Sequence, residues 1–159
     1  MSELTVSTEA LAGVEAMCAV TLPASFPKFL ERYQGAKPVD GEFDITSTGD
    51  THYLEQFLVC VDRTSHPKFF WADIGVVYSQ ADERLTFEDA AGDLIVFVPF
   101  AALFTGDLLV LDYRESDTEP RVGVWFHERS RPYVPYVEDV AESFDAFLNQ
   151  IEIDLDSNN

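Results

Sequence analysis

The chain has few basic side chains. Its 159 residues include 10 lysines and arginines against 29 aspartates and glutamates, which gives a formal net charge of −19. The basic residues are scattered between Lys28 and Arg131, whereas contact with phosphate backbones needs clustered lysine and arginine. The sequence therefore predicts no direct nucleic-acid binding, and an anionic membrane surface would repel the chain for the same reason. The charge favours a cationic partner, although solubility alone also explains it.

Long apolar runs and cysteine are also scarce. The longest apolar run, residues 94–104, is too short for a membrane span of about 20 residues; because it contains Pro99, we expect a core strand leading into a turn. The first basic residue is Lys28, so there is no basic region of the kind that begins a secretory signal. Cys18 and Cys60 are too few for a disulfide framework, and we expect both to be buried thiols. Together these features predict a cytoplasmic protein.

Apolar residues, in contrast, are plentiful in the sequence. Apolar residues make up 47% of the sequence, including 13 phenylalanines, which is too much for a disordered chain. The length suits one domain. We therefore expect a single domain over residues 1–159, with its core at about residues 8–151 and a polar tail at residues 152–159.

Helical spacing of apolar residues predicts four helices, at residues 8–19, 23–33, 72–85 and 140–151. The clearest stripe is formed by Phe26, Phe29, Leu30 and Tyr33, and Gly35 follows it as a stop signal. Strands are predicted at residues 42–46, 53–61, 94–98, 108–113 and 122–126. Because the strands group together instead of alternating with helices, we expect an α+β fold. Its mostly antiparallel sheet would be flanked by two N-terminal helices, a middle helix and a C-terminal helix.

Motifs for catalysis, phosphate binding or dinucleotide binding are missing from the sequence. His127 and Glu128 begin like a zinc-protease motif, but Arg131 stands where the second histidine is required. We therefore predict no enzymatic activity, no metal and no cofactor. An enzyme or metal-dependent protein that uses the surplus carboxylates is the least favoured alternative.

Carboxylates gather in blocks with few or no basic residues. The block at residues 82–93 holds five acids against only Arg84, and it is expected in a loop leading out of a helix. Loops carry binding function more often than core elements do, so this block is the preferred candidate for partner contact. A solvated surface is the alternative for the alternating acids at residues 40–44 and for the acids of a loop at residues 114–120. The acidic candidates for partner binding are Asp40, Glu42, Asp44, Asp82, Glu83, Glu88, Asp89, Asp93, Asp117 and Glu119.

Affinity also needs buried aromatic anchors. Trp71, Tyr113 and either Tyr133 or Tyr136 are the candidates, with core packing as the alternative for each.

Several segments resemble the SUKH superfamily. Leu22-Pro23, Phe29-Leu30 and Tyr33-Gln34-Gly35 follow a predicted helix, as in the opening signature of that superfamily: a helix, Leu-Pro, Phe-Leu and Tyr-Asn-Gly-Gly. Residues 99–101, 106–114 and 120–128 resemble its central strands, and residues 141–148 resemble its closing helix. The likeness spans about residues 8–151. Gln34 replaces the usual asparagine, Ala36 replaces the second glycine, and residues 47–70 match nothing in the pattern.

The resemblance implies a SUKH-like α+β domain without catalytic residues. It further implies a bacterial immunity protein that binds and neutralises a cognate toxin, such as a nuclease, in a polymorphic toxin system. The net charge favours a basic toxin domain, which we expect to be bound by a monomer or weak homodimer. The alternative is a non-catalytic intracellular scaffold or regulatory module that binds a host protein.

Overall fold

The computed structural model describes residues 4–38 and 44–157 of the chain. Its elements, in chain order, are α1 (Thr8–Cys18), α2 (Phe26–Tyr33), β1 (Asp44–Thr46), β2 (Thr51–Phe57), the 3₁₀ helix η1 (Pro67–Ala72), α3 (Ile74–Gln80), β3 (Thr86–Glu88), β4 (Leu94–Val96), β5 (Val98–Leu103), β6 (Leu108–Asp112), β7 (Arg121–Trp125), β8 (Val137–Ala141) and α4 (Phe144–Ser157).

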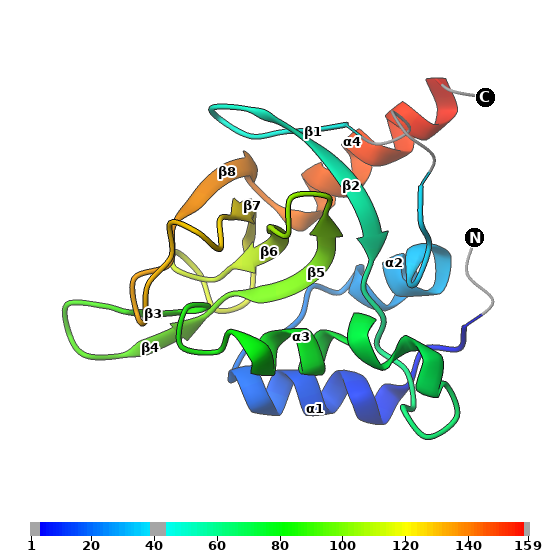
Figure 1. Cartoon of the computed structure of the whole chain (residues 1–159), viewed down its shortest axis with the longest axis horizontal. Helices are drawn as coiled ribbons and strands as arrows, with labels where there is room; N and C mark the ends of the chain where they lie inside the picture. The colour runs from blue at the N-terminus through cyan, green and yellow to red at the C-terminus, as the bar shows by residue number, and fades with distance from the viewer. Residues whose placement is uncertain (1–3, 39–43, 158–159) are drawn as a thin grey trace.

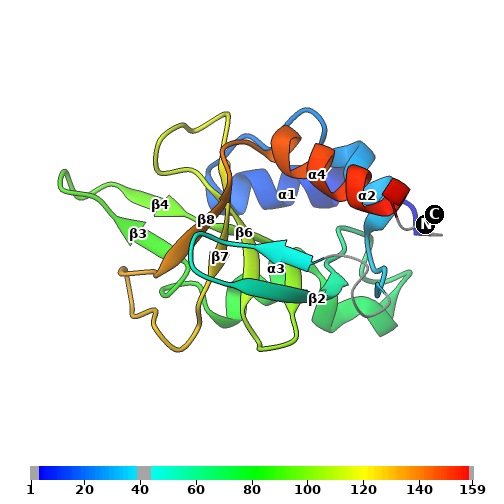
Figure 2. The same cartoon turned by 90° about the horizontal axis from the view of Figure 1, so that it is seen from above.

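The strands form a six-stranded sheet in the order β1-β2-β5-β6-β7-β8 and a separate hairpin, β3-β4. Neighbouring strands of the described sheet pair antiparallel throughout. Helices α1, α2 and α4 lie on one side of the sheet, and η1 and α3 lie on the other (Figure 2). This arrangement confirms the predicted α+β fold with a largely antiparallel sheet.

The two edges of the sheet meet at one corner, where the β1–β2 turn lies beside β8 (Figures 1 and 2). The backbone N–H of Thr48 donates to the carbonyl of Asp139 over 3.0 Å, and the Ser47 hydroxyl donates to Glu138 Oε1 over 2.6 Å. Strand β8 packs closely against Gly123 of β7, since a Cβ at this position would clash with the Val137 side chain. Glycine at residue 123 therefore allows the close approach of β8. The sheet is therefore strongly curled.

The main core lies between the sheet and helices α1, α2 and α4. Phe29 is at its centre, with its ring edge-on to Phe57, Phe100 and Phe144 at 5.2–5.8 Å. A smaller cluster on the other face of the sheet contains Trp125. Strand β6 is buried along its whole length, which agrees with its unbroken apolar run at residues 108–111.

Two helix predictions were wrong at their ends. The helix predicted at residues 72–85 is only α3, because the Asp73 carboxylate accepts from the Val76 N–H and starts the helix there, and the chain leaves it after Gln80. The second helix begins at Phe26, since Pro23 serves in the turn before it: the Phe26 N–H donates to the Pro23 carbonyl.

The strand predictions were wrong at three places. The segment predicted as one strand at residues 53–61 leaves the ladder after Phe57. Pro99 was expected to bring a turn but lies inside β5, where a shift in register between Pro99 and Ala101 accommodates its missing N–H. Residues 137–141 form β8, and the last helix begins only at Phe144, where the Ser143 hydroxyl accepts from the Ala146 N–H. That helix continues to Ser157, through most of the segment expected to be a polar tail.

The turn after α2 is built around Gln34, one of the two residues that depart from the signature. Gln34 is 1% exposed, its Oε1 accepts from the Cys60 N–H over 3.0 Å, and its Nε2 donates to the Leu4 carbonyl. Gly35 follows with φ +75°, a conformation that suits glycine. The glutamine side chain thus ties the N-terminal segment and the strand-like segment after β2 to the end of α2.

Replacing Gln34 with leucine is expected to lower the free energy of unfolding by about 1–3 kcal/mol, because the buried Cys60 N–H then loses its acceptor. Urea unfolding followed by circular dichroism measures the change. Gln80→Leu, at an exposed position at the end of α3, serves as the control with the same substitution. Equal stability of the two variants would contradict the structural role of Gln34.

Candidate partner-binding surfaces

The β3–β4 hairpin projects from the body of the protein (Figures 1 and 2). Thr86 pairs with Val96 and Glu88 with Leu94, so the block expected in a loop is in fact a short two-stranded ribbon. Its turn is well defined, because Asp89 Oδ1 accepts from the N–H groups of Ala91 and Asp93, each over 2.9 Å. Asp89 therefore shapes the turn, while Glu88 and Asp93 are exposed beside it.

The base of this hairpin rests on Arg114. The guanidinium lies 5.8 Å from the centre of the Phe87 ring and 5.1 Å from that of Phe97, and Nη2 donates to Asp112 Oδ2 over 2.8 Å. The hydrogen bonds and charge of Asp112 raise the pKa of Arg114. Asp82 and Glu83 are exposed where the chain enters the hairpin. The structure thus places Glu88, Asp89 and Asp93 on the projecting hairpin and Asp82 and Glu83 in the turn at its base.

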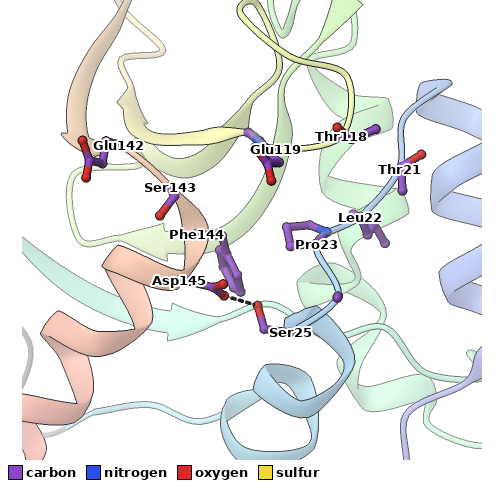
Figure 3. Close-up of a pocket in the computed structure, with 12 residues that line it drawn as sticks. Thr21, Leu22, Pro23, Ser25, Thr118, Glu119, Glu142, Ser143, Phe144 and Asp145 are labelled. Carbon is purple, nitrogen blue, oxygen red and sulfur yellow. Dashed lines mark hydrogen bonds between the residues drawn. The ribbon is translucent and has the colours of Figure 1, made fainter.

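A groove of about 610 Å³ lies on another part of the surface (Figure 3). Three segments form it: the α1–α2 connection at residues 21–25, the β6–β7 loop at residues 118–120, and the start of α4 at residues 142–145. The Thr21 N–H donates to the Asp117 carbonyl and the Tyr113 hydroxyl donates to the Thr21 carbonyl, which holds the first two segments together. These segments include Leu22-Pro23 of the opening signature and part of residues 141–148, which resemble the closing helix of the superfamily.

The groove combines an apolar floor with acidic side chains. Leu22, Pro23 and Phe144 contribute apolar surface, and the carboxylates come from Glu119, Glu142 and Asp145. Asp145 accepts from the Ser25 hydroxyl over 2.6 Å. None of the described residues that line the groove is basic, so it is suited to a cationic side chain of a partner.

The predicted aromatic anchors divide into buried and exposed ones. Tyr113 is 4% exposed and belongs to the core, and burial raises the pKa of its hydroxyl, so it is not available as an anchor. Trp71 is 71% exposed, and Tyr133 and Tyr136 are partly exposed. Among the acidic candidates, Asp40 and Glu42 lie outside the described residues, and for Asp44 only the backbone, in β1, is described.

Two polar clusters join residues far apart in the sequence, which is why sequence reasoning missed them. His127 Nδ1 lies 2.6 Å from Asp107 Oδ1, which also accepts from the His127 N–H. Asp107 also binds within its own turn, where its Oδ2 accepts from the Thr105 hydroxyl over 3.0 Å. This pair fastens the β5–β6 turn to the end of β7.

The second cluster contains Ser47, His52 and Glu138. Ser47 Oγ lies 3.1 Å from His52 Nε2 and donates to Glu138 over 2.6 Å. The same Oγ also lies 3.3 Å from the Asp50 carbonyl, within the β1–β2 turn. In a hydrolytic triad the carboxylate orients the histidine. Here it accepts from the serine instead, and the cluster ties the β1–β2 turn to β8.

The thiols of Cys18 and Cys60 are buried, as predicted, with 3% and 2% exposure. Burial raises the pKa of each thiol to about 12. Within residues 4–38 and 44–157, no group of three or more histidine, cysteine or acidic side chains is placed to hold a metal ion. The described helices include none with the length and apolarity that crossing a bilayer requires.

The fold and these surfaces define an α+β domain suited to protein recognition. The chain belongs to the SMI1/KNR4 family (SUKH-1), because the sequence model of that family matches residues 5–150. The match confirms the resemblance and includes residues 47–70, which the signature left unplaced. Members of the family are in general non-catalytic domains that bind protein partners, and they commonly serve as immunity proteins. Comparisons with characterised proteins and with solved structures gave no match.

Proposed function

We propose that this chain is a cytoplasmic, non-catalytic immunity protein that binds a cognate bacterial toxin of a polymorphic toxin system and blocks it. Family membership over residues 5–150 is the observation that carries this proposal. The net charge of −19 supports a basic toxin domain, such as a nuclease, as the partner. Many nucleic-acid-degrading domains present a basic groove to their substrate, and an acidic protein is attracted to such a groove at long range.

The projecting hairpin is the part of the surface best placed for this attraction. Glu88 and Asp93 are exposed on it, and Asp82 and Glu83 add charge at its base. The groove with Glu119 lies at a second position and receives basic side chains once the partner is close. Charges of this kind raise the association rate and make it dependent on salt.

The proposal is tested with the toxin domain encoded beside the gene for this chain. The purified chain is expected to form a stable complex with that domain and to abolish its activity at a 1:1 ratio. Co-expression is expected to rescue cells that the toxin domain otherwise kills. Absence of both binding and rescue would refute the proposal; capture of a host protein without rescue would favour the scaffold function instead.

Neutralising the hairpin charge tests where the attraction acts. The double variant Glu88→Gln/Asp93→Asn is expected to lower the association rate constant about tenfold at low salt and to reduce its dependence on salt. Asp89 is left unchanged because its carboxylate shapes the turn. Glu9→Gln/Glu31→Gln, on exposed positions of α1 and α2, makes the same change in charge elsewhere. A control that slows association as much as the hairpin variant would show that only the overall charge matters.

A further inference from the structure

Exposed aromatic side chains gather on η1 and on the sheet face opposite the main core. Trp71 is 71% exposed and Phe70 40%, and their rings meet edge-on at 5.1 Å. Tyr53 of β2 is 56% exposed, and Phe104, just after β5, is 58% exposed. Exposed apolar patches of this kind mark interaction sites in soluble proteins. We refer to these four residues as the aromatic face.

Strand geometry connects the two pairs. The Phe104 N–H donates to the Tyr53 carbonyl over 3.1 Å, so these two residues are direct neighbours. Leu54, between Tyr53 and Glu55, points into the core, which leaves Tyr53 and Glu55 exposed on the opposite face of the sheet. Glu55 and Trp71 both line one groove of about 590 Å³. This groove therefore connects the exposed face of β2, which carries Tyr53, with η1.

The backbone holds Trp71 rigidly although its side chain is exposed. The next residue, Ala72, accepts from the Val59 N–H over 2.8 Å, and the Val59 carbonyl accepts from the Ile74 N–H over 2.9 Å. Asp73 is 5% exposed, caps α3 and lies 3.8 Å from the Nε of Arg63. An aromatic side chain on such a fixed backbone loses little freedom when it is buried by a partner, which is typical of a binding anchor.

The charge around this groove differs from that of the rest of the chain. Among the described residues that line it are Lys37, Lys68 and a single acid, Glu55, in a protein whose net charge is −19. A partner surface that fits it therefore presents an apolar site that receives Trp71, with a carboxylate beside that site that pairs with one of the lysines.

We propose that the aromatic face anchors the toxin domain, while the acidic hairpin only attracts it. This inference rests on the proposed function and adds the contact that sets the lifetime of the complex. Trp71 enters an apolar site on the toxin domain, and Lys68 pairs with a carboxylate at the edge of that site. Charge then governs how fast the complex forms, and the aromatic face governs how slowly it separates.

The test measures association and dissociation rates of the full chain with the toxin domain encoded beside its gene. Trp71→Ala is expected to raise the dissociation rate about 100-fold, within the range of an interface hot spot, and to leave the salt dependence of association unchanged. Lys68→Glu is expected to raise the dissociation rate about tenfold. Tyr136→Ala, a partly exposed aromatic elsewhere, and Lys28→Glu on α2 are the matched controls. Urea unfolding checks that each variant keeps the parent stability.

The outcomes separate the two proposals. If the parent chain binds and Trp71→Ala dissociates within twofold of it, the anchor is elsewhere and this inference is overturned while the immunity function stands. The same holds if Tyr136→Ala has the larger effect. If the parent chain does not bind the toxin domain at all, the proposed function fails and this inference fails with it.

Discussion

Replacing Phe29 with alanine is expected to lower the free energy of unfolding by about 3–5 kcal/mol, which is the usual cost of removing a large aromatic side chain from a core. Phe29 is 3% exposed, and its ring contacts those of Phe57, Phe100 and Phe144 edge-on. These partners belong to β2, β5 and α4, so one side chain joins three elements to α2. The cavity left by alanine would weaken every one of these contacts.

Urea unfolding of three variants measures this effect. Phe29→Leu keeps part of the volume and is expected to lose about half as much stability as Phe29→Ala. Phe104→Ala is the matched control, because Phe104 is 58% exposed and its removal leaves the core intact. Since domains of this size are stable by about 5–15 kcal/mol, Phe29→Ala would leave a marginal fold. A loss below about 1 kcal/mol would show that the cluster is not packed as described.

The sequence predicted those parts of the fold that depend on local patterns. The stripe that contains Phe29 predicted α2, and the strand predicted at residues 108–113 is β6. The strand predicted at residues 122–126 is β7, in which Val122 and Val124 lie in the main core and Trp125, on the other face, lies in the smaller cluster. These patterns suffice because the burial of each side chain follows from its position within one element.

Tertiary contacts decided the parts that were predicted wrongly. Residues 137–141 carry apolar side chains at positions that also fit the helical pattern of α4, and only pairing with β7 makes them a strand. Pro99 is tolerated because β5 shifts register beside it. The acids at residues 82–93 gave no strand signal of their own, and the hairpin forms where Phe87 and Phe97 meet Arg114. Propensity alone does not contain these interactions.

For the candidate surfaces too, the sequence predicted which residues are involved but not how the fold arranges them. Composition identified the acidic block and Trp71, but it did not show that the acids project on a hairpin or that Tyr113 is buried. The Asp107–His127 pair and the groove with Glu119 join segments distant in sequence. No local spacing rule could have found them. The sequence also did not predict that Lys37 and Lys68 line the same groove as Trp71, because the two lysines come together only through the fold.

Alkaline solution is expected to unfold the protein, and Cys18 and Cys60 account for most of the effect. Burial in the folded state raises the pKa of both thiols to about 12, and for Cys60 the charge of Asp73 adds to this. In the unfolded chain they ionise near pH 9. The folded state therefore holds these protons longer. The two protonated thiols therefore contribute fully to the free energy of unfolding below about pH 9, and this contribution is lost as the pH rises towards 12.

The expected loss is about 2–3 kcal/mol per cysteine near pH 11, or about 5 kcal/mol for both, which is comparable to the whole free energy of unfolding of a domain. Urea unfolding at about pH 7 and pH 11 measures it for the parent and for Cys18→Ala/Cys60→Ala. Comparing each protein with itself at the two pH values removes the cost of the substitutions at neutral pH. The double variant is expected to lose about 5 kcal/mol less than the parent. The loss of stability that remains in the double variant includes a contribution from Tyr113, because burial also raises the pKa of its hydroxyl. An equal loss of stability in the parent and in the double variant would assign the alkaline transition to groups other than the thiols.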